Sequence, residues 1–187
     1  MEVYDLLGCC SAMRSRGAQV TDVAVLVVAA DDGVMQQTRE AIRHVQSAQC
    51  ALVVALTKCD LSGARPAEVE AELLAEGLEL ESAGGNVQVV QVAAPKGMGL
   101  SELEEAIMLQ AELLGVSAPV DTLAEGTVVE AQVDKGQGPL VTVVMRQGTL
   151  CVGQPFVVGK QHGRVRLLQS PDGRALNSVT PGELLHT

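Results

Sequence analysis

Two different patterns of hydrophobic positions divide the chain. From Thr21 to about Gly115, short apolar runs alternate with segments whose apolar residues recur at helical spacing. An apolar run without polar alternation is typical of a parallel strand buried on both faces. Strand–helix repetition indicates a parallel sheet built of βαβ units. The expected strands are 23–30, 51–56 and 87–92, and the expected helices are 37–48, 67–75 and 101–114.

Two of these helices carry start signals. Pro66 directly precedes the second helix and suits a first-turn position, where its missing N–H costs nothing. Ser101 and Glu104 form a capping-box pattern at the start of the third helix, whose apolar positions repeat along one face. We therefore expect the third helix to begin at Ser101.

After Pro119 the pattern changes to short, Val-rich runs separated by turns that contain glycine. This spacing is typical of a small antiparallel barrel or sandwich. The expected strands are 126–133, 139–146, 155–158 and 163–168. The sequence thus predicts an α/β plus all-β chain, with an incomplete parallel-sheet domain over 1–115, a linker over 116–123 and a β-barrel domain over 124–187.

Composition excludes several classes of protein. The 187 residues are 47% hydrophobic and only 1% aromatic, so the core of this soluble, folded chain must be built from Val, Leu, Ala and Ile. The net charge of −10 lies entirely within residues 1–120, which disfavours binding to DNA or to phosphate backbones in general. No apolar run reaches the roughly 18 residues of a membrane span. Five cysteines without C-x-x-C spacing predict neither a disulfide framework nor a metal site.

The strand over 51–56 ends in a charged turn that contains Lys58 and Asp60. In an open parallel sheet, ligands bind beyond the carboxyl ends of the strands. A carboxylate there can accept two hydrogen bonds from guanine, one from N1–H and one from the exocyclic amine, and adenine offers no matching pair. The alkyl stem of Lys58 can lie along the base. The alternative is an ordinary charged turn, since two charged residues commonly follow a strand.

Several longer segments resemble bacterial or organellar translation initiation factor 2, a family of translational GTPases. The similarity runs from Ser11 to about Pro181, and its most specific parts are residues 11–22, 25–35, 126–130, 134–139 and 146–153. It implies a partial GTP-binding (G) domain before the linker and an elongation-factor-like β-barrel, domain II, after it. It also implies GTP or GDP as ligand and initiator tRNA and the ribosome as partners. The implied compartment is the mitochondrion or plastid, with the bacterial cytoplasm as the alternative.

The resemblance carries over to the base-recognition residues in part. The family's motif is Asn-Lys-x-Asp, which Lys58 and Asp60 match, whereas Thr57 offers a hydroxyl in place of the amide. The family's second base-contact loop reads Ser-Ala-Lys, and here Ala93 and Ala94 are followed by a proline. The Ala94 N–H could approach guanine O6. The resemblance thus implies guanine-side contacts from all five of these residues.

The phosphate side lacks its motifs. No G-x-x-x-x-G-K-[ST] loop occurs in the sequence. Where the family has Asp-Thr-Pro-Gly-His, only Asp5 and Gly8 stand as candidate switch remnants near magnesium and the γ-phosphate, and a chance match is the alternative. We expect weak or absent binding of GTP or GDP, with Mg²⁺ bound only if a further segment supplies the phosphate loop. No residue is assigned as catalytic, so hydrolysis by this chain alone is not expected.

Three functions are considered for this chain. The chain is part of a translation initiation GTPase with guanine contacts at Lys58 and Asp60, or it is a nucleotide-free module that interacts with the ribosome. A dinucleotide-dependent enzyme is the third reading, but no G-x-G-x-x-G opens a helix here.

Overall fold

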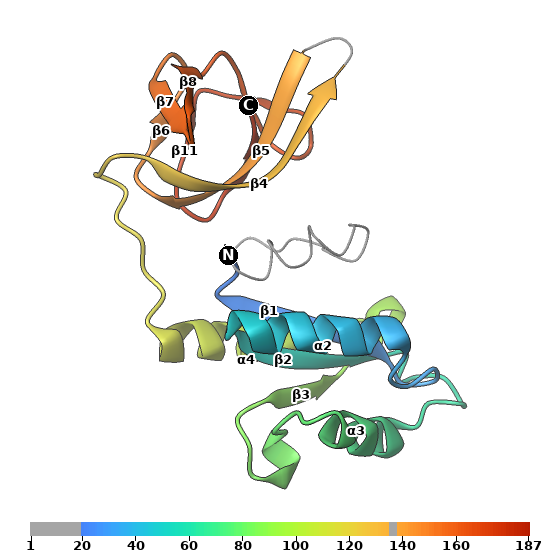
Figure 1. Cartoon of the computed structure of the whole chain (residues 1–187). Coiled ribbons are helices and arrows are strands. Elements are labelled where there is room, and N and C mark those ends of the chain that lie inside the picture. The colour runs from blue at the N-terminus through green and yellow to red at the C-terminus, as the bar shows by residue number, and fades with distance from the viewer. Residues whose placement is uncertain (1–19, 135–137) are drawn as a thin grey trace. The chain divides into compact units, whose positions relative to one another are not determined.

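The computed structural model describes residues 20–134 and 138–187 (Figure 1). Asp5 and Gly8 lie outside these residues. The described chain forms two compact units, 21–116 and 117–187. Within the described ranges, no helix is both long and apolar enough to cross a membrane.

The first unit is a parallel sheet with helices on both faces. Its strands are hydrogen-bonded in the order β1-β2-β3, with Val23 of β1 opposite Ala51 of β2 and Val53 of β2 opposite Gln88 of β3. The elements follow the chain as β1 (Val23–Ala29), α2 (Gln36–Ala48), β2 (Ala51–Thr57), α3 (Pro66–Ala75), the 3₁₀ turn η1 (Glu81–Ala83), β3 (Gln88–Gln91), the 3₁₀ turn η2 (Ala94–Lys96) and α4 (Leu100–Leu114).

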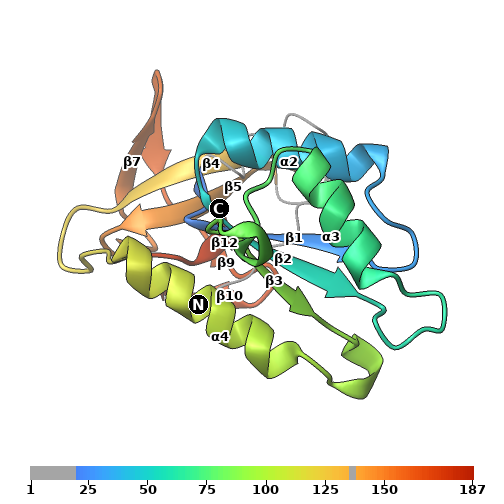
Figure 2. The same cartoon turned by 90° about the horizontal axis from the view of Figure 1, so that it is seen from below.

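Alternate side chains of the strands point to opposite faces of the sheet and pack against different helices. Leu26 of β1 and Leu56 of β2 pack with Ile42 of α2 and Leu73 of α3 in one apolar cluster. Figure 2 shows α2 and α3 on this face of the sheet and α4 on the other. β2 is the central strand, and its residues 52–56 are almost completely buried. At the edge strand β1, the side chain of Val27 is 49% exposed.

The predicted strands and helices of this unit are confirmed, with boundaries shifted by a residue or so. The predicted capping box is wrong. Helix α4 begins at Leu100, its N-cap is Gly99 with φ of 76°, and no side chain caps it. Ser101 lies inside the first turn, because the chain reverses at Gly99 one residue earlier than the pattern indicates. A Cβ at Gly99 would lie 2.0 Å from the Gln91 carbonyl oxygen, so the tight turn requires glycine.

The second unit consists of antiparallel sheets. A five-stranded sheet has the order β10-β9-β12-β5-β4, and two ribbons pair β11 with β6 and β7 with β8. The strands are β4 (Glu125–Asp134), β5 (Gly138–Gln147), β6 (Leu150–Cys151), β7 (Pro155–Val158), β8 (Gln161–Arg164), β9 (Leu168–Gln169), β10 (Ala175–Leu176), β11 (Ser178–Val179) and β12 (Leu184–His186).

One core joins these sheets. It contains Met145, Leu168, Val179 and Leu185, each 3% exposed or less, with Phe156 packed against them. The predicted antiparallel class is confirmed, although the described strands form an open sheet and two ribbons in place of a closed barrel. The single strand predicted over 163–168 is wrong. This stretch contains the end of β8 and the start of β9, and the Val165 N–H between them donates to the Gln154 carbonyl.

The residues before β4 are bound to the second unit. The Gly148 N–H donates to the Pro119 carbonyl over 2.8 Å, and the Thr149 hydroxyl donates to the Val120 carbonyl over 3.0 Å. Gly148 has φ of 71°, and a Cβ there would lie 2.5 Å from the Leu123 backbone. Pro119 and Val120, which lie in the predicted linker, are therefore hydrogen-bonded to the turn between β5 and β6.

Replacing Leu73 by alanine should destabilise the first unit by about 2–5 kcal/mol, because Leu73 is fully buried and its loss leaves a cavity. The neighbouring Leu74, 38% exposed, is the matched control, and Leu74→Ala should cost less than about 1 kcal/mol. Urea titration followed by amide NMR signals of residues 21–116 measures both. Equal costs for the two variants would contradict the placement of α3.

Gly148→Ala should destabilise the second unit more than Gly173→Ala. Both glycines have positive φ, which costs a residue with a Cβ about 1–2 kcal/mol. Only at Gly148 would the new methyl group also collide with backbone, since nothing lies within 4 Å at Gly173. Thermal unfolding followed by NMR signals of residues 124–187 checks the order, and a reversed order would refute the close contact with Leu123.

Candidate functional site

The candidate site lies at the carboxyl edge of the parallel sheet, where three loops follow β1, β2 and β3. Hydrogen bonds between the strand ends fix these loops to one another. The Ala30 N–H donates to the Thr57 carbonyl over 2.9 Å, and the Val92 N–H donates to the Leu56 carbonyl over 2.7 Å. The Cys59 N–H then donates to the Val92 carbonyl. The loops after β2 and β3 are therefore joined directly beside the Lys58–Asp60 turn.

Lys58 stands in an unusual backbone conformation. Its φ of 58° is in the left-handed region, which non-glycine residues rarely adopt. The Lys58 ammonium lies 3.0 Å from the carboxylate of Asp31 and 3.0 Å from that of Asp32, both in the loop after β1. These ion pairs connect the first and second loops of the site.

The Lys58–Asp31 contact shifts the pKa of both groups. The hydrogen bond from Lys58 is the main cause that lowers the pKa of the Asp31 carboxyl below its ordinary value of 3.8. Hydrogen bonds to Asp31 and Asp32 raise the pKa of the Lys58 ammonium. Both shifts favour the charged forms, as an opposite charge within hydrogen-bonding distance does.

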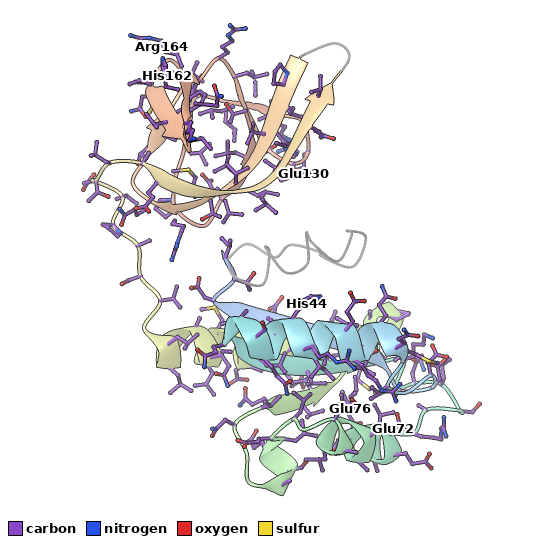
Figure 3. The ribbon with its side chains drawn as sticks, in the orientation of Figure 1. His44, Glu72, Glu76, Glu130, His162 and Arg164 are labelled. Atoms are coloured by element: carbon purple, nitrogen blue, oxygen red, sulfur yellow. The ribbon has the colours of Figure 1, made fainter. Side chains whose placement is uncertain are left out.

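The loop that carries Asp31 and Asp32 is itself held against α3. The Val34 N–H donates to the Glu72 carboxylate over 2.8 Å, and the Arg39 guanidinium pairs with Glu76 over 2.6 Å. Figure 3 labels Glu72 of α3 and Glu76, the C-cap residue that directly follows α3. Gly33, with φ of 77°, leaves room for the Glu72 carboxylate, 2.8 Å from where a Cβ would be. The carboxylates that bind Lys58 thus stand on a fixed loop.

Asp60 pairs with a residue of the third loop. Its carboxylate lies 3.2 Å from the ammonium of Lys96, the last residue of η2. The Asp60 side chain is 17% exposed, and that of Lys96 is 62% exposed. The Cys59 thiol, between Lys58 and Asp60, points inward and donates to the Leu56 carbonyl over 3.1 Å. Lys58 and Asp60 therefore face different neighbours from one short turn.

The other three predicted site residues lie at the same edge. The Thr57 hydroxyl donates to the Val28 carbonyl over 3.4 Å, so it bonds to β1. Ala93 is fully buried, and its N–H donates to the Met98 carbonyl over 2.9 Å. Ala94 is exposed at the start of η2. The structure thus brings all five residues to one edge, with the side chain or N–H of Thr57 and Ala93 engaged in the protein.

Sequence analysis missed the partners of both charged residues. Asp31, Asp32 and Lys96 are not among the site residues predicted from the sequence. Their signal was present, because each stands two to five residues after a parallel strand and so reaches the same sheet edge as Lys58 and Asp60. In the described parts of the chain, no group of three or more His, Cys, Asp or Glu side chains could hold a metal ion.

Comparison with known families gives a match over each unit. The elongation factor Tu GTP-binding domain matches residues 11–112, more than half of the chain. The chain belongs to the elongation factor Tu GTP-binding domain family. Domain 2 of elongation factor G matches residues 123–186, as the antiparallel sheets of the second unit lead one to expect.

The similarity to translation initiation factor 2 is confirmed. The chain is 52% identical over 171 residues to Translation initiation factor IF-2 of Gluconacetobacter diazotrophicus, covering 91% of this chain and 19% of that protein. It is 50% identical to the IF-2 of Granulibacter bethesdensis over the same shares. The chain therefore spans about a fifth of the length of these relatives.

Solved structures share the fold. GDP-bound aIF5B from Aeropyrum pernix matches 95% of this chain with a TM-score of 0.74 and 22% identity, over 38% of its own chain. A bacterial selenocysteine-specific elongation factor EF-Sec matches 92% of this chain with a TM-score of 0.67 and 26% identity, over 29% of its own chain. Membership of this GTP-binding family implies a guanine nucleotide as the ligand class.

Replacing Lys58 by methionine should return the pKa of Asp31 towards 3.8, since the ammonium that lowers it is gone. Because the pKa of Asp31 is lowered in the folded chain, the pair with Lys58 is complete above about pH 4 and is lost as the pH falls through the lowered value. A carboxyl NMR titration measures the shift. Lys96→Met is the control, and an equal rise in that variant would argue against a specific Lys58–Asp31 contact.

Proposed function

We propose that this chain forms part of a translation initiation factor of the IF-2 type, a GTP-binding protein that promotes initiator tRNA binding and ribosomal subunit joining. The observation that carries this proposal is the 52% identity to an IF-2 across 171 residues, which include most of both units. The ribosome and initiator tRNA are the proposed partners. The second unit, proposed as domain II, accompanies the nucleotide-binding part as in these relatives.

The proposed ligand contacts are those of the guanine side. Asp60 accepts hydrogen bonds only, and its partly exposed carboxylate suits the N1–H and amine donors of guanine. The stem of Lys58 lies along the base, and the exposed Ala94 offers its N–H from the neighbouring loop. Thr57 and Ala93 act indirectly, because their bonds to Val28 and Met98 hold the strand end and the loop in place.

The proposed contacts to the guanine base, without phosphate contacts, predict weak nucleotide binding. A hydrogen bond to a charged group contributes about 1.5–3 kcal/mol, whereas association loses 4 kcal/mol or more in translational and rotational freedom. Most affinity in such sites comes from phosphate contacts at a glycine-rich loop and helix N-terminus. The proposal therefore assigns this segment a dissociation constant of about 1 mM or weaker, with Mg²⁺ binding dependent on phosphate contacts that the described residues do not supply.

One observation favours the alternative of a nucleotide-free module that interacts with the ribosome. Both charged residues of the motif already have protein partners, since Lys58 pairs with Asp31 and Asp32, and Asp60 pairs with Lys96. The motif is thus satisfied without a ligand. A nucleotide titration separates the two functions.

In that titration, Asp60→Asn should weaken GDP binding at least tenfold, because an amide cannot accept two hydrogen bonds from guanine through both of its terminal atoms. Chemical-shift changes of residues 57–60 and 92–96 measure binding, with ADP as the ligand that should not bind. Asp172→Asn, an exposed change of equal charge in the second unit, should leave GDP binding unchanged. Absence of GDP binding to the unmodified chain would favour the nucleotide-free module.

A further inference from the structure

Lys96 reaches Asp60 from a loop whose backbone is fixed. The Lys96 N–H donates to the Ala93 carbonyl over 3.0 Å, and Ala93 exchanges two backbone hydrogen bonds with Met98. The Val92 carbonyl at the base of this loop accepts from Cys59, the neighbour of Asp60. The 3.2 Å ion pair between Lys96 and Asp60 therefore joins two loops that the backbone already holds side by side.

The ammonium of Lys96 stands where a base donor would have to approach. It lies on Oδ2 of Asp60, and a lysine ammonium offers up to three N–H donors. Guanine recognition uses both oxygens of the carboxylate, one for N1–H and one for the exocyclic amine. Lys96 can swing away, since its side chain is 62% exposed, whereas Asp60 is only 17% exposed and stays at the turn.

We propose that Lys96 is a specificity-determining residue that competes with the guanine amine for the Asp60 carboxylate. This inference rests on the proposed function, because it concerns the affinity of the same site. A base with one donor needs one oxygen and leaves the ion pair intact, whereas guanine must displace Lys96 from Oδ2. Lys96 thus lowers the preference of the site for guanine over hypoxanthine, which lacks the amine.

The test compares GMP with IMP, which differ only in this amine, on the full chain by NMR titration. Lys96→Met removes the ammonium and keeps an unbranched side chain that is only one heavy atom shorter. An ion pair that is partly exposed is worth a modest free energy, so GMP should bind about two- to fivefold tighter to this variant, with IMP nearly unchanged. The GMP-to-IMP affinity ratio is the readout, because a general change of loop structure would alter both ligands alike.

Two controls make the ratio specific. Lys160→Met removes an exposed ammonium in the turn between β7 and β8 and should leave both affinities unchanged. Raising the ionic strength from about 0.05 M to about 0.5 M screens the ion pair, so the ratio of the unmodified chain should rise towards that of Lys96→Met. The phosphate group is common to GMP and IMP, and its own salt dependence cancels in the ratio.

Each outcome has a distinct meaning. A raised ratio in Lys96→Met, with GMP binding lost in Asp60→Asn, supports the competition. An unchanged or lowered ratio in Lys96→Met, with GMP binding still lost in Asp60→Asn, overturns the role of Lys96 and leaves the proposed function standing. If GMP binds neither the unmodified chain nor Lys96→Met, the proposed function fails, and this inference fails with it.

Discussion

The burial of β2 on both faces is the constraint on which the site depends. Because Val53, Val54 and Leu56 are fully buried, the strand cannot shift its register without exposing apolar surface to water. The turn that follows β2 is therefore held in a fixed position at the carboxyl edge of the sheet, between the loops that follow β1 and β3. Asp31, Lys58, Asp60 and Lys96 meet there because a strand that is apolar over residues 51–56 is packed between two layers of helices (Figure 2).

The site is a set of opposite charges on separate loops, and the loops differ in how they are held. The first loop is clamped to α3 through Glu72, whereas the third is closed on itself by the Ala93–Met98 pairing. In both cases carboxylates and ammonium groups meet at about 3 Å near the protein surface, where each pair is weak by itself. Weak pairs are suited to a site that exchanges partners when a ligand arrives.

The sequence predicted the first unit well because its strands are long, apolar and separated by helices of clear periodicity. It failed where a local signal competed with tertiary geometry, as at Ser101, which the turn at Gly99 placed inside the helix. It missed β6 and β9 to β12, since strands of two or three residues are too short to show alternation. The motif selected Lys58 and Asp60 but not their partners. The positions of Asp31, Asp32 and Lys96 after strands place them at the same sheet edge, but do not show which side chains pair there.

The left-handed backbone of Lys58 limits which residues fit this position without strain. Glycine would adopt φ of 58° without strain, and a β-branched residue would adopt it only at considerable cost. Lysine occupies the position with this strained backbone, and its ammonium pairs with Asp31 and Asp32. Arginine would keep the charge but present a wide planar group to two carboxylates that now share one compact ammonium. Substitutions at this residue are thus constrained in two ways, by the backbone conformation and by the shape of the charged group.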